Sequence, residues 1–149
     1  MSECVKSTYE EYLDKYGTLT YRNVGTSMMP LLKQGRDIFT VRKKDAKRCQ
    51  KYDVVLYRRP PDKYVLHRII KVRNNDYVIL GDNCINKEYG IKDEDIIGIM
   101  TEFIREGKKY SVENKKYRIY SILWCNFSGI RIFFKKIKIK LKRQNKNEK

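Results

Sequence analysis

The sequence predicts a mainly β protein, in which an antiparallel or mixed sheet folds over on itself between a short N-terminal helix and an amphipathic C-terminal helix. Short segments rich in β-branched and aromatic residues follow one another without a helical segment between them. After residue 116, apolar residues recur instead at steps of three and four, the spacing of an amphipathic helix. A chain of 149 residues is long enough for one domain with a real core. We therefore divide it into an N-terminal helix (1–17), a β-domain (18–113) and a helix with a lysine-rich tail (114–149).

The predicted elements follow from local patterns. Ser7 and Glu10 have the spacing of a capping box and Gly17 follows, so a helix is expected over residues 8–16. Alternation of apolar and polar residues predicts strands over residues 19–24, 37–42, 53–58, 64–72, 77–80, 96–103 and 110–112. The helical spacing covers residues 119–134. The tail beyond it alternates lysine and isoleucine, which leaves its secondary structure open.

Charge is concentrated at the C-terminal end. The net charge is +16, and residues 131–149 alone contain nine Lys or Arg and one acid, so half of the net charge lies there. Such a cationic end predicts an anionic partner, either a phospholipid surface or nucleic acid. The short acidic segment ahead of the first motif holds no helix-turn-helix pattern, which disfavours nucleic acid. The aromatic stripe of Trp124, Phe127, Phe133 and Phe134 suits a helix lying in an anionic leaflet, or equally a helix packed on the sheet.

Cysteine usage argues against a metal site. Cys4, Cys49, Cys84 and Cys125 are widely separated and the chain has one histidine, which does not fit the ligand spacing of zinc sites. Because the first residues are polar rather than a secretory signal, we expect four reduced thiols, a cytoplasmic location and no cofactor. Residues 119–134 are too short and too polar for a simple membrane span, so we expect a protein peripheral to the membrane.

A candidate nucleophile lies in the segment Gly25-Thr-Ser-Met-Met-Pro30, which breaks the first strand. A glycine permits a sharp turn and a proline fixes the exit direction, so Ser27 is expected at an exposed edge where an extended peptide can bind. A serine in such a turn more often only hydrogen-bonds the backbone, and that alternative stays open for Ser27 taken alone.

His67 is the candidate base. It is the only imidazole of the chain and lies inside an otherwise apolar strand. A serine hydroxyl needs an adjacent base to act as a nucleophile near neutral pH, and imidazole titrates in the suitable range. The alternative is a strand histidine whose ring is satisfied by a backbone carbonyl. In the segment from Gly81 to Gly90, either Asp82 or Glu88 is placed to orient the ring, unless both are solvated turn residues.

Taken together, four segments between Tyr21 and Gly98 resemble the type I signal peptidases and the wider S24/S26 peptidase family. The similar segments, in family order, are a nucleophile box, a Gly-Asp-Val-Val strand, a base-bearing strand and a Gly-Asp-Asn box: Thr26-Ser-Met-Met-Pro-Leu-Leu-Lys-Gln-Gly35, Lys51-Tyr-Asp-Val-Val-Leu-Tyr57, Tyr64-Val-Leu-His-Arg-Ile69 and Leu80-Gly-Asp-Asn83. Each segment is weak alone, and they are specific as a set.

The resemblance implies a signal-peptidase-like or LexA-like β-fold and a serine endopeptidase that cleaves leader or signal peptides, or itself. Most bacterial members carry lysine as the base, whereas His67 resembles the archaeal and endoplasmic-reticulum branch with its Ser–His pair. In that branch a carboxylate occurs six residues beyond the acid of the Gly-Asp-Asn box. Glu88 stands at that spacing from Asp82, so the resemblance carries both acids over as candidates.

The resemblance also assigns supporting roles around Ser27. Many members with a lysine base have a Ser or Thr hydroxyl two residues before the nucleophile to bind the oxyanion, and here that position is Gly25. The oxyanion would then be bound by the backbone N–H of Ser27, supported by the Thr26 hydroxyl. The substrate-binding residues expected on this basis are Gly25, Met28, Met29 and Pro30.

Two further functions are compatible with the same motifs. One is a LexA-like self-cleaving regulatory protein that binds an anionic partner. The other is a catalytically silent member that acts as a scaffold at the membrane, because retained motifs do not guarantee activity. Because residues 1–16 are polar, we expect no counterpart of the N-terminal membrane anchor of signal peptidases.

Overall fold

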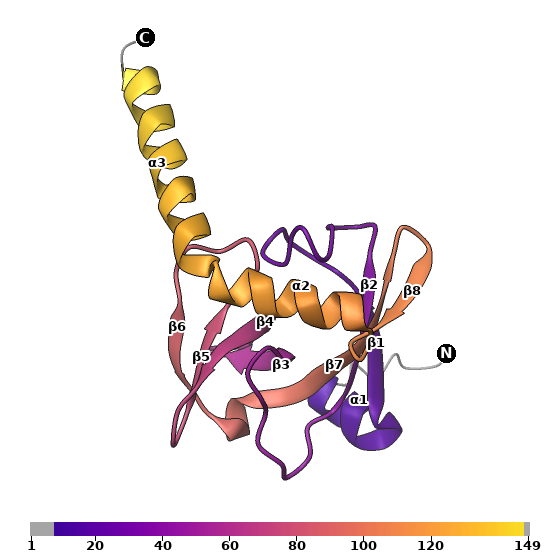
Figure 1. Cartoon of the computed structure of the whole chain (residues 1–149). Helices are drawn as coiled ribbons and strands as arrows, with labels where there is room; N and C mark the ends of the chain where they lie inside the picture. Colours follow the sequence, from indigo (N-terminus) through magenta and orange to yellow (C-terminus); the bar gives the residue numbers. More distant parts are fainter. Residues whose placement is uncertain (1–7, 148–149) are drawn as a thin grey trace, which may run out of the picture.

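The computed structural model describes residues 8–147 and confirms the predicted fold class (Figure 1). Its helices and strands are α1 (Tyr9–Tyr16), β1 (Thr18–Arg22), β2 (Ile38–Lys43), β3 (Val54–Arg59), β4 (Lys63–Val72), β5 (Tyr77–Leu80), β6 (Glu88–Ile91), β7 (Ile96–Arg105), β8 (Lys108–Ser111), α2 (Lys115–Asn126) and α3 (Ser128–Asn147). The sheet has eight strands in the order β1-β2-β7-β3-β4-β5-β6, with β8 added on β7. All of these pairings are antiparallel, so the mixed alternative does not occur within residues 8–147.

The N-terminal helix has a capping box one residue later than predicted. The Glu11 N–H donates to the Thr8 hydroxyl at 3.2 Å, and the Thr8 N–H donates to the Glu11 carboxylate at 2.9 Å. Thr8 and Glu11 therefore replace the predicted pair of Ser7 and Glu10, and Ser7 lies outside the described residues. Both pairs have the same spacing, which is why the spacing alone could not choose between them. The helix ends at Gly17, as predicted.

The seven predicted strands coincide with observed strands to within two residues at either end. The sequence patterns assign no strand to residues 88–91, where the structure has β6. It is only four residues long, its middle residues are exposed, and Gly90 interrupts any alternation. It pairs with β5, and Glu88 lies opposite Ile79. This short strand therefore carries one of the two candidate acids onto the sheet.

The central strand β3 is buried on both sides of the sheet. Its residues divide alternately between two apolar cores: Val54 and Leu56 belong to the core beneath α1, and Val55 and Tyr57 to the second. This division follows from the period of two along a strand. In the register of β3 and β4, Val55 lies opposite His67. The candidate base thus lies in the buried middle of β4, opposite a buried residue of the central strand.

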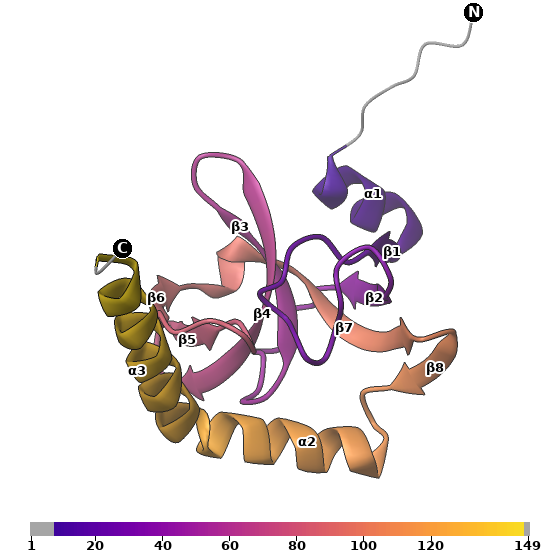
Figure 2. The same cartoon turned by 90° about the horizontal axis from the view of Figure 1, so that it is seen from above.

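The C-terminal segment forms two helices rather than the single one predicted. α2 ends at Asn126, and Phe127 caps it; α3 begins at Ser128 and continues through the lysine-rich tail, whose secondary structure the sequence does not predict. Figures 1 and 2 show α2 running across the body at the periphery and α3 leaving it at an angle, with its C-terminal turns beyond the sheet. Within residues 8–147, none of the helices combines the length and apolar character needed to cross a bilayer.

A buried ion pair joins the sheet to α2. The guanidinium of Arg68 on β4 donates to both carboxylate oxygens of Asp82, each at 2.8 Å, and both side chains are almost fully buried. Arg68 also donates to the Ser121 hydroxyl at 2.8 Å, and the Tyr120 hydroxyl donates to Asp82 at 2.9 Å. Burial alone would lower the pKa of Arg68, but Asp82 outweighs it and raises that pKa. The loop carrying Asp82 is therefore fixed between β4 and α2.

Replacement of Asp82 by alanine is expected to destabilise the fold by about 3–5 kcal/mol, because it leaves the Arg68 guanidinium buried without its carboxylate. Urea unfolding followed by circular dichroism measures this loss. The control is Asp76→Ala, which removes the acid of a solvent-exposed pair with Arg73 and should change the unfolding free energy far less. Similar losses in the two variants would contradict a structural role for the buried pair.

Candidate active site

Ser27, His67 and Glu88 line one open cleft of about 870 Å³. They come from three parts of the fold: the turn after β1, the middle of β4 and the start of β6. Part of the cleft wall is the first half of β4, from Tyr64 to His67. This half pairs with β3 on one side, whereas the pairing of β5 with β4 begins only at Arg68. Within the described part of the chain, the other edge of β4 at the cleft therefore has no neighbouring strand.

The turn that carries Ser27 is anchored to the first apolar core by buried side chains that follow Ser27 in the sequence. Gly25 has a φ of +82°, a conformation that glycine adopts without strain, and it turns the chain after β1. Ser27 itself is half-buried and lines the cleft. The Leu32 N–H donates to the Met28 carbonyl at 2.9 Å, and both of these side chains lie in the first core. Ser27 therefore lies in a turn that is fixed by core packing.

This packing corrects one predicted substrate-binding residue. Met28 is 1% exposed and belongs to the core, so it cannot contact a substrate in this conformation. In a turn of this kind, neighbouring side chains point in different directions, and a methionine is apolar enough to fill the core. Of the remaining predicted contact residues, Met29 is half-buried and Pro30 is exposed, while Thr26 is exposed beside Ser27.

His67 is 4% exposed, and its two ring nitrogens have different surroundings. Nδ1 lies 3.2 Å from the carboxylate of Glu88 and 3.3 Å from the hydroxyl of Tyr57. Nε2 is buried and has no hydrogen-bond partner among the described residues. A carboxylate next to Nδ1 favours the tautomer with the proton on that nitrogen, which leaves a lone pair on Nε2. This is the arrangement that a general base requires.

The acid beside the imidazole is Glu88, and its charge is held by neighbours. Burial raises the pKa of Glu88, but hydrogen bonds from Arg59 and Tyr57 outweigh that effect and leave it below its usual range. Both nitrogens Nε and Nη2 of Arg59 donate to the Glu88 carboxylate. Glu88 is therefore ionised at neutral pH. It stabilises both the Nδ1–H tautomer and the positive charge that His67 acquires on protonation.

Asp82 does not contact His67; its carboxylate is taken by Arg68 and Tyr120. Of the two acids that the sequence left open, the structure places only Glu88 on the ring. The two carboxylates are separated by six residues, yet they end up in different environments because β6 turns Glu88 back towards β4. The role proposed for Asp82 as orienting acid is corrected to a structural one.

The loop after β5 contacts the Ser27 turn directly. The Asn83 N–H donates to the Ser27 carbonyl at 2.7 Å, and the Asn83 side chain donates to the Thr26 carbonyl at 3.0 Å. Gly81 permits this approach: a Cβ there would lie 2.9 Å from Nε2 of His67 and 2.9 Å from the Ser27 carbonyl oxygen. The nucleophile turn and the base are therefore brought together over the backbone of Gly81.

Three helix residues outside the predicted catalytic set complete this junction, and one of them, Trp124, belongs to the predicted aromatic stripe but contacts the loop after β5. The Trp124 ring N–H donates to the Asp82 carbonyl at 2.9 Å, and Arg131 donates to the same oxygen. Lys135 donates to the Asn83 side-chain oxygen at 2.7 Å and to the Asn83 carbonyl. These residues are 42 to 52 positions away from the loop residues they contact, so no local pattern indicates the contacts. Tyr57 and Arg59, which contact Glu88 and His67, lie two residues apart on β3. Their place on the same face of the sheet could be predicted from the period of two along a strand.

Cys84 is a second potential nucleophile in the same cleft. The Cβ position at Gly81 lies 2.6 Å from its Sγ, so the thiol is also close to Nε2 of His67. Burial raises the pKa of the Cys84 thiol, and the charge of Lys135 only partly opposes this. The thiol is therefore protonated at neutral pH. It lacks the thiolate character of reactive cysteines, which favours Ser27 as the nucleophile.

The electrostatic setting of His67 keeps it neutral. Burial lowers its pKa below the usual 6.5; the charge of Glu88 opposes this, and Arg59 adds to it. The unprotonated ring therefore predominates at neutral pH, and a rate that depends on the free base should rise with pH through a midpoint below 6.5.

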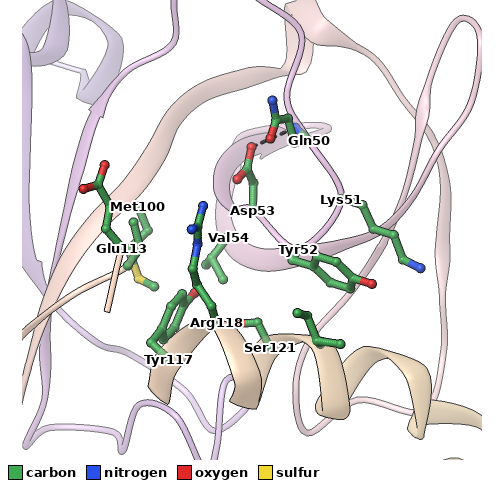
Figure 3. Close-up of a pocket in the computed structure, with 12 residues that line it drawn as sticks. Gln50, Lys51, Tyr52, Asp53, Val54, Met100, Glu113, Tyr117, Arg118 and Ser121 are labelled. Carbon is green, nitrogen blue, oxygen red and sulfur yellow. Dashed lines mark hydrogen bonds between the residues drawn. The ribbon is translucent and has the colours of Figure 1, made fainter. Parts of the chain in front are cut away.

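A second pocket lies where α2 crosses the sheet, and Figure 3 shows its lining. It measures about 460 Å³ and includes Asp53, Glu113, Arg118 and Ser121. The Ser121 hydroxyl accepts a hydrogen bond from Arg68, and the only histidine of the chain lies in the other cleft. The pocket thus has no pair of a nucleophile and an imidazole base. Within residues 8–147, His, Cys, Asp and Glu side chains do not gather in threes that would hold a metal ion.

Comparisons with protein-family models, with curated proteins and with solved structures give no match to this chain. The resemblance to the signal peptidases therefore stays a prediction from the four motifs. Chemical interpretation of the cleft accordingly depends on the geometry of Ser27, His67 and Glu88.

Substitution of Gly81 by alanine is expected to separate the loop from the Ser27 turn, because the added methyl group meets a backbone oxygen and a ring nitrogen. Overpacking of this kind costs about 1–3 kcal/mol, measurable by urea unfolding. The matched control is Gly129→Ala in α3, where nothing lies within 4 Å of the new methyl group. This control should be neutral or slightly stabilising. A neutral Gly81→Ala variant would show that the close approach is not required.

Proposed function

We propose that the chain is a serine endopeptidase of signal-peptidase type, with Ser27 as nucleophile, His67 as general base and Glu88 as the residue that orients His67. The observation that supports this best is the asymmetry of the His67 ring. Nδ1 is paired with an ionised carboxylate, while Nε2 is buried and unpartnered among the described residues, near the Ser27 turn. A structural histidine in a strand would be expected to have both nitrogens satisfied.

In the proposed reaction, His67 Nε2 takes the proton of the Ser27 hydroxyl as Oγ attacks the carbonyl carbon of the scissile peptide. The backbone N–H of Ser27 and the Thr26 hydroxyl would stabilise the oxyanion of the tetrahedral intermediate. Its collapse breaks the C–N bond, and His67 gives its proton to the leaving amine. A water molecule then attacks the acyl ester, with His67 taking and returning a proton, to release the carboxylic acid and restore Ser27.

An extended peptide is the substrate shape that the cleft favours. Among residues 8–147, no strand pairs with the second edge of β4 from Tyr64 to His67, and an extended peptide could be added there as a further strand. Val24, which is 74% exposed, and Ile85 give the cleft apolar surface beside Ser27. Such a site would bind a leader or signal peptide in extended form and direct one carbonyl towards Ser27.

Labelling with a fluorophosphonate probe tests the assignment of the nucleophile. We expect wild type and Cys84→Ser to be labelled, and Ser27→Ala not to be labelled, because the probe reacts with an activated serine hydroxyl. His67→Ala should be labelled about 10²–10⁴-fold more slowly, the usual contribution of a general base. Mass spectrometry of the labelled peptide locates the modified residue.

Cys84→Ser is the matched control, because it changes one atom in the same cleft. If Ser27→Ala were still labelled, or His67→Ala reacted as fast as wild type, the proposed pair would be wrong. Labelling at Cys84 with an iodoacetamide probe, abolished in His67→Ala, would instead point to a thiol nucleophile.

A further inference from the structure

Nine large apolar side chains on α2, on α3 and at Phe127 between them are exposed to solvent, and we call this surface the outer face. Each is 40–63% exposed, and they recur at steps of three and four residues: Ile119, Ile122, Leu123, Phe127, Ile130, Phe133, Phe134, Ile137 and Leu141. Single exposed apolar residues are ordinary, whereas an extended apolar patch on one protein marks an interaction site. The outer face is the side of the helices that the fold leaves uncovered.

The opposite side of the same helices is already occupied. Trp124, Arg131 and Lys135 hydrogen-bond to the loop after β5, and Ile132 is buried. Because these contacts hold α2 and α3 in place, rotation of the helices cannot bring the outer face onto the body. Figure 2 shows both helices at the periphery of the molecule. Any cover for the outer face must therefore come from outside the described residues.

The charge of these helices indicates which kind of partner could bind the outer face. Residues 115–147 contain eleven Lys or Arg and no Asp or Glu. A second copy docked through the same face would bring two strongly cationic helices together without compensating acids, which is unfavourable. Nucleic acid would match the charge, but would leave the phenylalanines and isoleucines against a polar backbone. A partner with anionic groups at its surface and an apolar layer beneath them matches both the positive charge and the apolar side chains of the helices.

We propose that the outer face lies in the interface of an anionic phospholipid bilayer. In this position Phe133, Phe134 and Ile137 enter the boundary between headgroups and acyl chains, as amphipathic helices do when they lie in the plane of a membrane. Lysines beside the apolar stripe, such as Lys138 and Lys140, extend their stems along it and place their ammonium groups among acidic headgroups. The helices thus attach the protein to one side of the membrane.

This attachment also positions the cleft. Lys135 and Ile139 of α3 line it, and Lys135 is bonded to Asn83, whose N–H contacts Ser27. One helix therefore faces the bilayer on one side and the candidate active site on the other. Resting on the proposed function, this geometry favours as substrate an extended peptide segment that emerges at the membrane surface.

Co-sedimentation of the full chain with vesicles tests the proposal. The wild type should pellet with vesicles of phosphatidylcholine that contain about 30 mol% phosphatidylserine. This composition approximates the negative charge of a cytoplasmic leaflet. Pure phosphatidylcholine vesicles should bind the wild type at least about tenfold more weakly, because the attraction to lysine is lost. The double variant Phe133→Ser, Phe134→Ser should lose at least about tenfold in partitioning to the anionic vesicles.

The matched control is Tyr12→Ser, Tyr16→Ser, which removes two exposed aromatic side chains from α1. It should bind like the wild type. Equal binding of the phenylalanine variant and the wild type would overturn the proposal, as would equal binding to neutral and anionic vesicles. A dimer in light scattering that disappears in the phenylalanine variant would identify a second copy as the occupant instead.

Failure of membrane docking and failure of the peptidase assignment can be told apart. Fluorophosphonate labelling of Ser27 without lipid reports only the site, and the phenylalanine variant should be labelled like the wild type. Ser27→Ala should in turn bind anionic vesicles like the wild type. Loss of labelling with intact vesicle binding would therefore reject the peptidase alone, and the converse would reject the docking alone.

Discussion

The buried ion pair between Arg68 and Asp82 fixes the loop on which the candidate site is assembled. Breaking such a pair leaves an uncompensated charge in the interior, so the loop has little freedom to move while the fold persists. The next residue, Asn83, hydrogen-bonds the Ser27 turn, and Gly81 lets that turn approach His67. The charge pair therefore helps to hold the Ser27 turn near His67, together with the core packing of Met28 and Leu32 in the same segment.

Two carboxylates close in sequence have separate tasks because their partners differ. Asp82 pairs with the buried guanidinium of Arg68 and stabilises the fold. Glu88 is hydrogen-bonded by Arg59 and contacts the imidazole of the candidate site. The result is a histidine whose ring is oriented from one nitrogen and unpaired at the other. Environment, rather than residue type, therefore distinguishes a structural acid from one that orients a base.

Alternation and helical spacing were enough to predict the sheet, its long hairpin and the C-terminal helical character, since these follow from periods of two and 3.6. Strand β6 could not be predicted, because it has four residues, of which the middle two are exposed, and these show no alternation of apolar and polar side chains. The choice between Asp82 and Glu88 was open because it depends on which distant partner each acid meets. The contact of Lys135 with the loop could not be predicted from the sequence, because it forms only when α3 packs against the body. Met28 shows the same limit: a motif gives a residue's place in the chain, and the fold decides which side of the turn it occupies.

The state of the single imidazole tests the central claim most directly. Because the chain has one histidine, its ring ¹⁵N resonances belong to His67 without further assignment. We predict a neutral ring with the proton on Nδ1 and a titration midpoint below the usual 6.5, since burial lowers the pKa more than Glu88 raises it. In Glu88→Gln the Nδ1–H signal should weaken, whereas Glu94→Gln, an exposed acid, should leave it unchanged. A proton on Nε2, or a midpoint above 6.5, would contradict the account.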